Sequence, residues 1–141
     1  MKHHVDRIVQ AFETLTPGGV QALDSVYAAD ARFIDPFNDV CGVAAIQHVF
    51  RHMYASLEAP RFVIVERIVQ GSQCFLTWEF RFHFKRFQVS EEQCIPGGSH
   101  LVLNDSGQVI LHRDYWDTAD LYEKLPLLGG VMRWLKRQAR K

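Results

Sequence analysis

The segment over residues 73–87 constrains the fold of this chain more than any other part of the sequence. Apolar and polar side chains alternate along it with a period of two, which is the period of a β-strand. One face carries Cys74, Leu76, Trp78, Phe80, Phe82 and Phe84. The opposite face carries Gln73, Phe75, Thr77, Glu79, Arg81, His83 and Lys85. Such a strand belongs to a sheet with one buried and one wetter face, so other parts of the chain must cover the apolar face.

Three helices are predicted ahead of this strand. Apolar residues recur every three or four positions over residues 4–15, as they do in an amphipathic helix. Thr16 is a suitable N-cap for a second helix that reaches about residue 27. Residues 43–57 form the third predicted helix, whose apolar stripe can lie on the sheet. Its polar face is formed by Gln47, His48, Arg51 and His52.

Further strands are predicted on both sides of residues 73–87. A short strand over residues 31–37 is followed by a turn at residues 38–39. The other predicted strands are residues 61–70, 99–103 and 108–116, with turns at 71–72 and 104–107 and a loop around 96–98. A C-terminal helical region follows, broken near Pro126 and at residues 129–130. Helices that cover one face of an antiparallel sheet make an α+β fold.

Length and composition are those of an ordinary globular domain. The 141 residues suffice for one domain over 1–141, with a core over about 5–117 and a C-terminal helical tail over 118–141. No apolar stretch approaches the roughly 20 residues of a membrane-spanning helix. The start of the chain lacks the pattern of a signal peptide. The three cysteines are odd in number and lack a C-x-x-C spacing, which favours reduced thiols and a cytoplasmic location.

The charges of the chain balance overall but are unevenly placed. The formal net charge is +0, which argues against a nucleic-acid partner, because such partners require a strongly basic surface. A basic tail is formed by Arg133, Lys136, Arg137, Arg140 and Lys141. These cations either form a solvated helix end, where they suit the helix dipole, or contact an anionic surface.

Three short motifs connect this order of elements to a known superfamily. They are Tyr-Ala-Ala-Asp-Ala-Arg-Phe-Ile-Asp-Pro over residues 27–36, Gly-Val-Ala-Ala-Ile over 42–46, and Asp-Ser-Gly-Gln-Val-Ile over 105–110, which leads to Tyr115-Trp116. Together they resemble the nuclear transport factor 2-like superfamily, which includes ketosteroid isomerases, SnoaL-type polyketide cyclases, limonene epoxide hydrolase and scytalone dehydratase. The resemblance implies a cone-shaped, curved antiparallel sheet wrapped around N-terminal helices, a cystatin-like α+β barrel. It also implies a homodimer.

The resemblance implies a general-base role for Asp35 and argues against steroid isomerase activity. In ketosteroid isomerases the motif over 27–36 ends in the aspartate that acts as general base, and Asp35 falls on that position. Their tyrosine donor falls at or beside Phe12, which cannot donate a hydrogen bond, and their protonated aspartate falls at Ser99. Each strong donor to a developing oxyanion is worth roughly 3–4 kcal/mol of barrier. We therefore expect no steroid isomerase activity.

The residues around Asp35 allow two interpretations of the role of its side chain. Phe33 and Phe37 flank it at a period of two, so the three side chains are predicted to share a face. A carboxylate desolvated among aromatic rings is suited to general-base chemistry. Alternatively, an aspartate before proline and a turn caps backbone N–H groups.

The predicted last strand supplies a second group of candidates. His112, Asp114 and Trp116 alternate and share a face, which Ile110 continues, whereas Arg113 has the opposite parity and is predicted on the convex face. By comparison with the superfamily, the shared face looks into the cone. His112 and Asp114 then form an acid–base pair for a ligand or a structural hydrogen-bond network beneath a buried indole.

The remaining candidates complete the predicted pocket. Counting from the superfamily places Ser99 rather than His100 inside the cone. Trp78 is expected to pack in the core more than to stack on a ligand. The predicted pocket residues are Phe12, Phe33, Phe37, Trp78, Phe80, Ser99 and Trp116. The i, i+4 pair of His48 and His52 is interpreted as surface histidines, and neither metal nor cofactor is expected.

Two functions fit these candidates. The first is a cofactor-free enzyme that acts on a small apolar substrate by general acid–base chemistry, as an isomerase, cyclase, dehydratase or hydrolase. Asp35 would be the base and His112 or Asp114 the acid or orienting group. The alternative is a non-catalytic module of the same fold that holds an apolar ligand or assembles with a protein.

Overall fold

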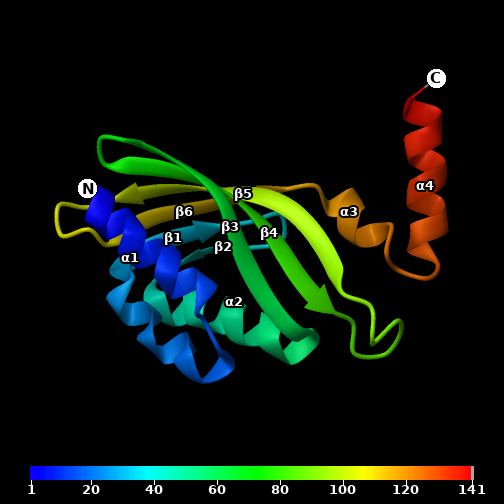
Figure 1. Ribbon diagram of the computed structural model, residues 1–141, viewed down its shortest axis with the longest axis horizontal. Helices are drawn as coiled ribbons and strands as arrows, with labels where there is room; N and C mark the ends of the chain where they lie inside the picture. The colour runs from blue at the N-terminus through cyan, green and yellow to red at the C-terminus, as the bar shows by residue number, and fades with distance from the viewer. Residues whose placement is uncertain (141) are drawn as a thin grey trace.

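A six-stranded curved sheet dominates the computed structural model, which describes residues 1–140 (Figure 1). The helices and strands are, in chain order, α1 Lys2–Glu13, the 3-10 helix η1 Pro17–Ser25, β1 Tyr27–Ile34, β2 Asp39–Cys41, α2 Val43–Ser56, β3 Glu58–Gln70, β4 Gln73–His83, β5 Gln93–Leu103, β6 Val109–Trp116, α3 Thr118–Tyr122 and α4 Leu128–Ala139. Helices α1 and α2 lie against one face of the sheet, which confirms the predicted α+β class (Figure 1).

The strand order is β2-β1-β6-β5-β4-β3. Neighbouring strands are antiparallel except β1 and β6, which are parallel, whereas an antiparallel sheet was predicted. The whole chain between β1 and β6 serves as the long connection that a parallel pair requires. The sheet remains open, with β2 and β3 at its edges, so the wrapping around the helices does not close into a barrel.

The alternation along β4 places its apolar side chains in the core as predicted. Leu76 and Phe82 are fully buried, and Trp78 is nearly so. On α1, the stripe of Val5, Ile8, Val9 and Phe12 is buried against the same face. At roughly 25 cal/mol per Å² of apolar surface removed from water, this contact is a main source of stability.

Several local predictions were wrong. The second helix is a 3-10 helix that ends at Ser25, although Thr16 caps it as expected by accepting from the Gly19 N–H at 3.1 Å. Strand β1 therefore begins at Tyr27 and ends before Asp35. The predicted turn at 38–39 lies two residues earlier, at 36–37, and leads into β2, which Asp39 ties to Arg32 of β1 with an ion pair of 2.7 Å.

The predicted polar face of α2 is also partly buried. Gln47 lies in the core, where its amide nitrogen donates to the carbonyl of Gln21 at 3.1 Å. His48, Arg51 and His52 remain exposed. A buried amide is tolerated at this position because its hydrogen bond replaces the one it gave to water.

Residues 96–98, predicted as a loop, lie inside β5. Gly97 pairs with Trp78 across the sheet, and a Cβ at Gly97 would lie 2.4 Å from the indole ring. A Cβ at Gly98 would lie 2.6 Å from the ring of Phe75 on the opposite face. The glycines therefore serve the close approach of aromatic rings rather than a turn. Pro96 precedes the start of β6 pairing at Gly97, so its missing N–H is not needed there.

The C-terminal region forms two short helices that leave the sheet after β6 (Figure 1). The break near Pro126 is present, but Gly129 and Gly130 lie in the first turn of α4 rather than at a break. A Cβ at Gly129 would lie 2.3 Å from the carbonyl oxygen of Glu123, so glycine lets α4 approach the end of α3. None of the helices within residues 1–140 is long and apolar enough to cross a membrane.

The three cysteines are free and differ in burial. Cys41 is exposed on β2, whereas Cys74 is buried and burial raises its pKa to about 11. A thiol with such a pKa is deprotonated to the order of 0.1% at pH 8. We expect Ellman's reagent to modify Cys41 rapidly and to reach Cys74 only after denaturation. Cys41→Ser should remove the rapid phase, and rapid labelling of Cys74 in the folded protein would contradict its burial.

Candidate functional site

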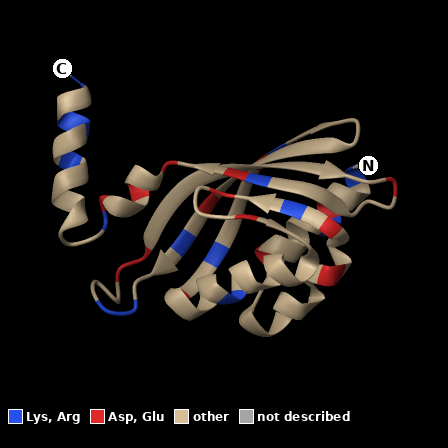
Figure 2. Ribbon diagram, turned by 180° about the vertical axis from the view of Figure 1, so that it is seen from behind, with Lys and Arg blue, Asp and Glu red and all other residues tan. Residues whose placement is uncertain are grey.

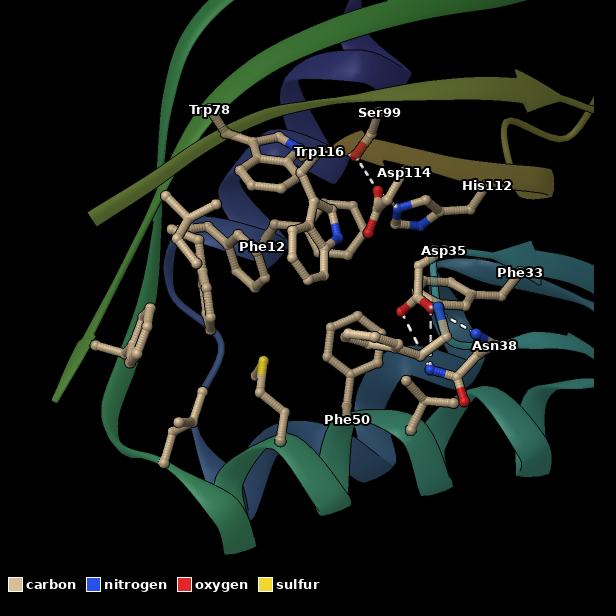
Figure 3. Close-up of a pocket in the computed structure, with 18 of the residues that line it drawn as sticks. Phe12, Phe33, Asp35, Asn38, Phe50, Trp78, Ser99, His112, Asp114 and Trp116 are labelled. Atoms are coloured by element: carbon tan, nitrogen blue, oxygen red, sulfur yellow. Dashed lines mark hydrogen bonds and ion pairs between the residues drawn. The ribbon is translucent and has the colours of Figure 1, made fainter. Parts of the chain in front are cut away.

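A cavity of about 600 Å³ lies between the concave face of the sheet and helices α1 and α2 (Figure 3). Most of its wall is apolar and comes from side chains of α2 and of strands β3 to β6. All the residues nominated from the sequence line it, namely Phe12, Phe33, Asp35, Phe37, Trp78, Phe80, Ser99, His112, Asp114 and Trp116. The structure therefore brings these residues together, while their catalytic and binding roles stay predictions.

A chain of hydrogen bonds forms the polar end of this cavity. The Trp78 indole N–H donates to Ser99 Oγ at 2.8 Å, and Ser99 Oγ donates to Asp114 Oδ1 at 2.5 Å. His112 Nε2 donates to the same Oδ1 at 2.6 Å, and Tyr27 Oη donates to His112 Nδ1 at 2.6 Å. At Ser99 the direction follows from Trp78, because an indole can only donate and the Ser99 hydroxyl then donates onward. At His112 it follows from Asp114, because a carboxylate can only accept, which places the imidazole hydrogen on Nε2 and leaves Nδ1 as the acceptor for Tyr27. Both branches of this hydrogen-bond chain thus end on the Asp114 carboxylate.

One oxygen of the Asp114 carboxylate has no hydrogen-bond partner within residues 1–140. Its hydrogen bonds with residues of the described chain all go to Oδ1. The second oxygen points into the cavity beside Trp116 (Figure 3). The indole N–H of Trp116 also has no partner within residues 1–140, and Trp116 lines the same space. A free acceptor and a free donor therefore belong to residues that line the same cavity.

His112 holds Asp114 in place. Only 4% of its surface is exposed, and both of its ring nitrogens are hydrogen-bonded. The rings of Phe33 and Phe12 pack edge-on against it, with centroid distances of 4.7 and 5.6 Å. A histidine fixed on both sides in this way orients the carboxylate.

Tyr27 belongs to this network, although we did not nominate it from the sequence. The helical spacing predicts residue 27 at the end of a helix, but Tyr27 is the first residue of β1, where its ring stacks on His112. Burial, and secondarily the charge of Asp114, raise the pKa of Tyr27 well above its ordinary value of 10.0. Its hydroxyl therefore stays protonated as a donor. The tyrosine that opens the superfamily-like motif over 27–36 was the available signal.

This shift gives a pH-dependent stability. Because the folded state favours the protonated phenol, the contribution of Tyr27 is complete below its unfolded-state pKa and is lost as the pH rises above about 10. We expect Tyr27→Phe to lower the free energy of unfolding by about 1 kcal/mol at pH 8. The difference between wild type and variant should shrink by pH 11, as measured by urea denaturation. A difference that does not change with pH would contradict the buried phenol.

Asp35 caps the turn after β1, as one of its two interpretations predicted, while its role as a general base stays a prediction. Its Oδ1 accepts from the Phe37 N–H at 2.8 Å and the Asn38 N–H at 2.7 Å, so it caps the turn after β1. The Asn38 amide donates to both carboxylate oxygens, at 3.1 and 3.2 Å. Asp35 also lines the cavity, opposite Asp114 (Figure 3).

Phe33 and Phe37 do not share a strand face, because β1 ends between them. Phe33 is buried beside His112, whereas Phe37 is largely exposed. The ring of Phe37 lies edge-on against Trp116, with a centroid distance of 5.5 Å. Phe37 is therefore a residue of the cavity rim.

A bulge in β6 corrects the predicted strand face. The pairing with β5 shifts between Val102 and Leu103, and the extra residue is Ile110. Val109 is consequently buried and Ile110 exposed, while His112, Asp114 and Trp116 keep the inward face. A bulge adds one residue to a strand, so side chains beyond it point to the face opposite to the one that strict alternation predicts.

The residues of opposite parity face away from the cavity. Arg113 lies over the Tyr115 ring, 5.4 Å from its centroid, and both are exposed. His100 bonds to Gln73 rather than to the cavity network, whereas Ser99 faces inward as predicted. His48 and His52 are exposed at the cavity rim. Across residues 1–140, no group of three or more His, Cys, Asp or Glu side chains is arranged to hold a metal ion.

A model of the SnoaL-like domain family matches residues 8–112, which is about three quarters of the chain. The chain belongs to the SnoaL-like domain family. The matched part of this SnoaL-like domain includes Tyr27, Asp35, Ser99 and His112. Comparison with curated proteins found no match.

Solved structures share the fold of this SnoaL-like domain at low sequence identity. A candidate SnoaL-like polyketide cyclase from Jannaschia sp. CCS1 has a TM-score of 0.74 at 17% identity, over 89% of this chain and 94% of the other. A hypothetical protein with a ketosteroid isomerase-like fold from Catenulispora acidiphila DSM 44928, in complex with trimethylamine, has a TM-score of 0.73 at 19% identity, over 84% and 93%. TerC, co-crystallised with polyporic acid, has a TM-score of 0.72 at 16% identity, over 86% and 94%. These likenesses confirm the nuclear transport factor 2-like fold.

Proposed function

We propose that this SnoaL-like domain binds a small apolar carbonyl compound in its cavity and removes a proton from it with Asp114 as general base. The observation that carries the proposal is the free oxygen of Asp114 at the polar end of an otherwise apolar cavity. A cavity of about 600 Å³ has the size of a small-molecule site. Two structural neighbours were crystallised with small molecules, trimethylamine and polyporic acid, which is consistent with a ligand here.

The proposed reaction begins with two contacts. The Trp116 N–H donates to the substrate carbonyl oxygen, and Asp114 Oδ2 takes the proton from the adjacent carbon. The C–H electron pair then moves into the carbonyl group and forms an enolate. In one outcome, protonated Asp114 returns the proton to another carbon. In the other, the enolate carbon attacks a second carbonyl within the substrate, whose C=O π pair moves to its oxygen, and this oxygen takes the proton back from Asp114. These two outcomes are an isomerisation and a cyclisation.

The surrounding residues support this assignment over one that uses Asp35. Ser99 and His112 occupy only Oδ1 of Asp114, so they fix the carboxylate without blocking it. Both oxygens of Asp35 already accept hydrogen bonds from the turn that it caps. Asp35 is therefore the second candidate for the base. The absence of two strong oxyanion donors, with Phe12 and Ser99 at those positions, favours substrates whose enolate is stabilised by conjugation.

The test is a ligand screen followed by hydrogen exchange. Thermal shift with cyclic enones, aromatic ketones, lactones, epoxides and steroids identifies compounds that bind the folded protein, because such ligands raise its melting temperature. Each ligand is then incubated with the protein in D₂O, and loss of its α-protons is followed by NMR. Catalysed exchange supports the enzyme. Stoichiometric binding without exchange supports the non-catalytic binding module instead, and no stabilising ligand would contradict the small-molecule site.

The homodimer implied by the resemblance is a separate proposal. Ile68, Phe75 and Tyr115 are apolar side chains on the convex face, and the rings of Phe75 and Tyr115 lie with centroids 6.5 Å apart. We expect sedimentation equilibrium to give twice the chain mass of 16.3 kDa, and Tyr115→Glu to give the monomer. A monomeric wild type would contradict this use of the convex face.

A further inference from the structure

Within residues 1–140, helix α4 contacts the rest of the molecule through one side only. Gly129 approaches the end of α3, and Arg133 donates to the Glu123 carbonyl oxygen at 3.0 Å. Lys136 forms ion pairs with Glu123 at 3.1 Å and Asp120 at 3.6 Å. Beyond these contacts, the helix stands away from the sheet (Figure 1). Helix α3 therefore holds α4 in a defined direction and leaves its other sides free.

The free side of α4 carries an apolar stripe. Leu128, Val131 and Leu135 recur at the three- and four-residue spacing of one helix face, and Trp134 lies beside them. All four side chains are exposed, and Val131 has 52% of its surface exposed. A contiguous apolar surface of this kind marks an interaction site.

The charged side chains of α4 and of the residues that follow it all have one sign. Five of the 16 Lys and Arg residues of the chain lie within residues 133–141, and no Asp or Glu follows Glu123 (Figure 2). The remaining 11 cations face 16 acidic residues, so the tail is positive and the rest of the chain is negative. Within residues 1–140, Arg137 and Arg140 form no ion pair and are available to an anionic partner.

We propose that α4 binds the surface of a bilayer that contains anionic lipids. Its apolar stripe would enter the boundary between headgroups and acyl chains, with the Trp134 indole at that boundary, and Arg137 and Arg140 would contact lipid phosphates. The 12-residue helix is about 18 Å long, so it lies on the surface and does not cross. The same helix of a second copy is a poorer occupant, because it presents like charges and no acidic partner.

The test uses the full chain and vesicles of two compositions. We expect flotation of the protein with vesicles of phosphatidylcholine and 30% phosphatidylglycerol, and no flotation with phosphatidylcholine alone. A blue shift of tryptophan fluorescence should accompany binding and be absent in Trp134→Phe. Replacing Arg137 and Arg140 with glutamine should weaken binding by about 30-fold, or roughly fivefold for each cation.

A matched pair of variants separates the stripe from general hydrophobicity. Val131→Glu should abolish flotation, whereas Val89→Glu should not, although both valines have 52% of their surface exposed. Both variants should keep the melting temperature of the wild type. Failure to float with anionic vesicles, or equal flotation of Val131→Glu, would overturn the proposal. A dimer that Val131→Glu dissociates, without vesicle binding, would assign the stripe to a second copy instead.

Discussion

Replacement of Asp114 with asparagine is expected to lower the exchange or turnover of a bound carbonyl compound by about 10²–10⁴-fold, the usual contribution of a general base. The amide oxygen can keep the hydrogen bonds from Ser99 and His112, because both end on Oδ1. The amide nitrogen then stands in place of Oδ2, and it cannot accept a proton. Ligand binding should change little, so the effect appears in the rate rather than in the thermal shift. Proton exchange followed by NMR measures the rate directly.

Two further variants make this expectation decisive. Asp105→Asn changes an exposed residue of the turn before β6 and should leave exchange unchanged. Asp35→Asn should lower exchange less than Asp114→Asn if Asp114 is the base. The reverse order would assign the base to Asp35, in keeping with its position in the superfamily-like motif. Equal rates in all three variants would rule out both carboxylates.

Replacement of Gly97 with alanine should lower the free energy of unfolding by about 1–3 kcal/mol, the usual cost of overpacking. Its Cβ would lie 2.4 to 2.9 Å from three atoms of the Trp78 ring. The indole cannot turn aside freely, because its N–H is bonded to Ser99 at 2.8 Å and its ring lies edge-on to Phe62. Since Trp78 lines the cavity, the melting temperature and the ligand-induced shift should both fall. Urea denaturation and thermal shift measure the two effects.

Gly18 provides the control for Gly97. It is exposed in η1, and nothing lies within 4 Å of the Cβ that alanine would add. Gly18→Ala should leave stability unchanged or raise it by up to about 1 kcal/mol, because alanine restricts the unfolded chain. Equal stability of Gly97→Ala and Gly18→Ala would show that Trp78 yields easily and that Gly97 is not required by packing.

The sequence predicted the inward residues well where a strict period held. The alternation over residues 73–87 identified Trp78, Phe80 and Phe82, because a strand with one buried face must alternate. The alternation predicted the wrong face for Ile110, because the pattern of apolar and polar residues does not reveal a bulge. Gly97 and Gly98 were predicted as a loop, since the rings that require glycine there belong to Trp78 and Phe75 on another strand.

The hydrogen-bond network was predictable only in part. His112 and Asp114 were nominated because they are two residues apart on one predicted strand. Tyr27 lies 85 residues before His112, and its role depends on the pairing of β1 with β6. No local pattern encodes a contact at that separation. The capping bonds of Asp35 join residues that are close in sequence, and the cap was accordingly one of the two interpretations that the sequence allowed.

The parallel pairing of β1 with β6 also sets the order in which this chain can fold. Arg32 pairs with Leu111, and Arg7 of α1 donates to the carbonyl oxygen of Gly107, 100 residues later, at 3.0 Å. During synthesis, β1 therefore emerges long before its partner and can pair only with β2 until β6 has left the ribosome. Contacts that are this distant in sequence slow folding, because a long loop must close before they form. The cavity, whose polar end lies on β6, is consequently among the last parts of the molecule to be completed.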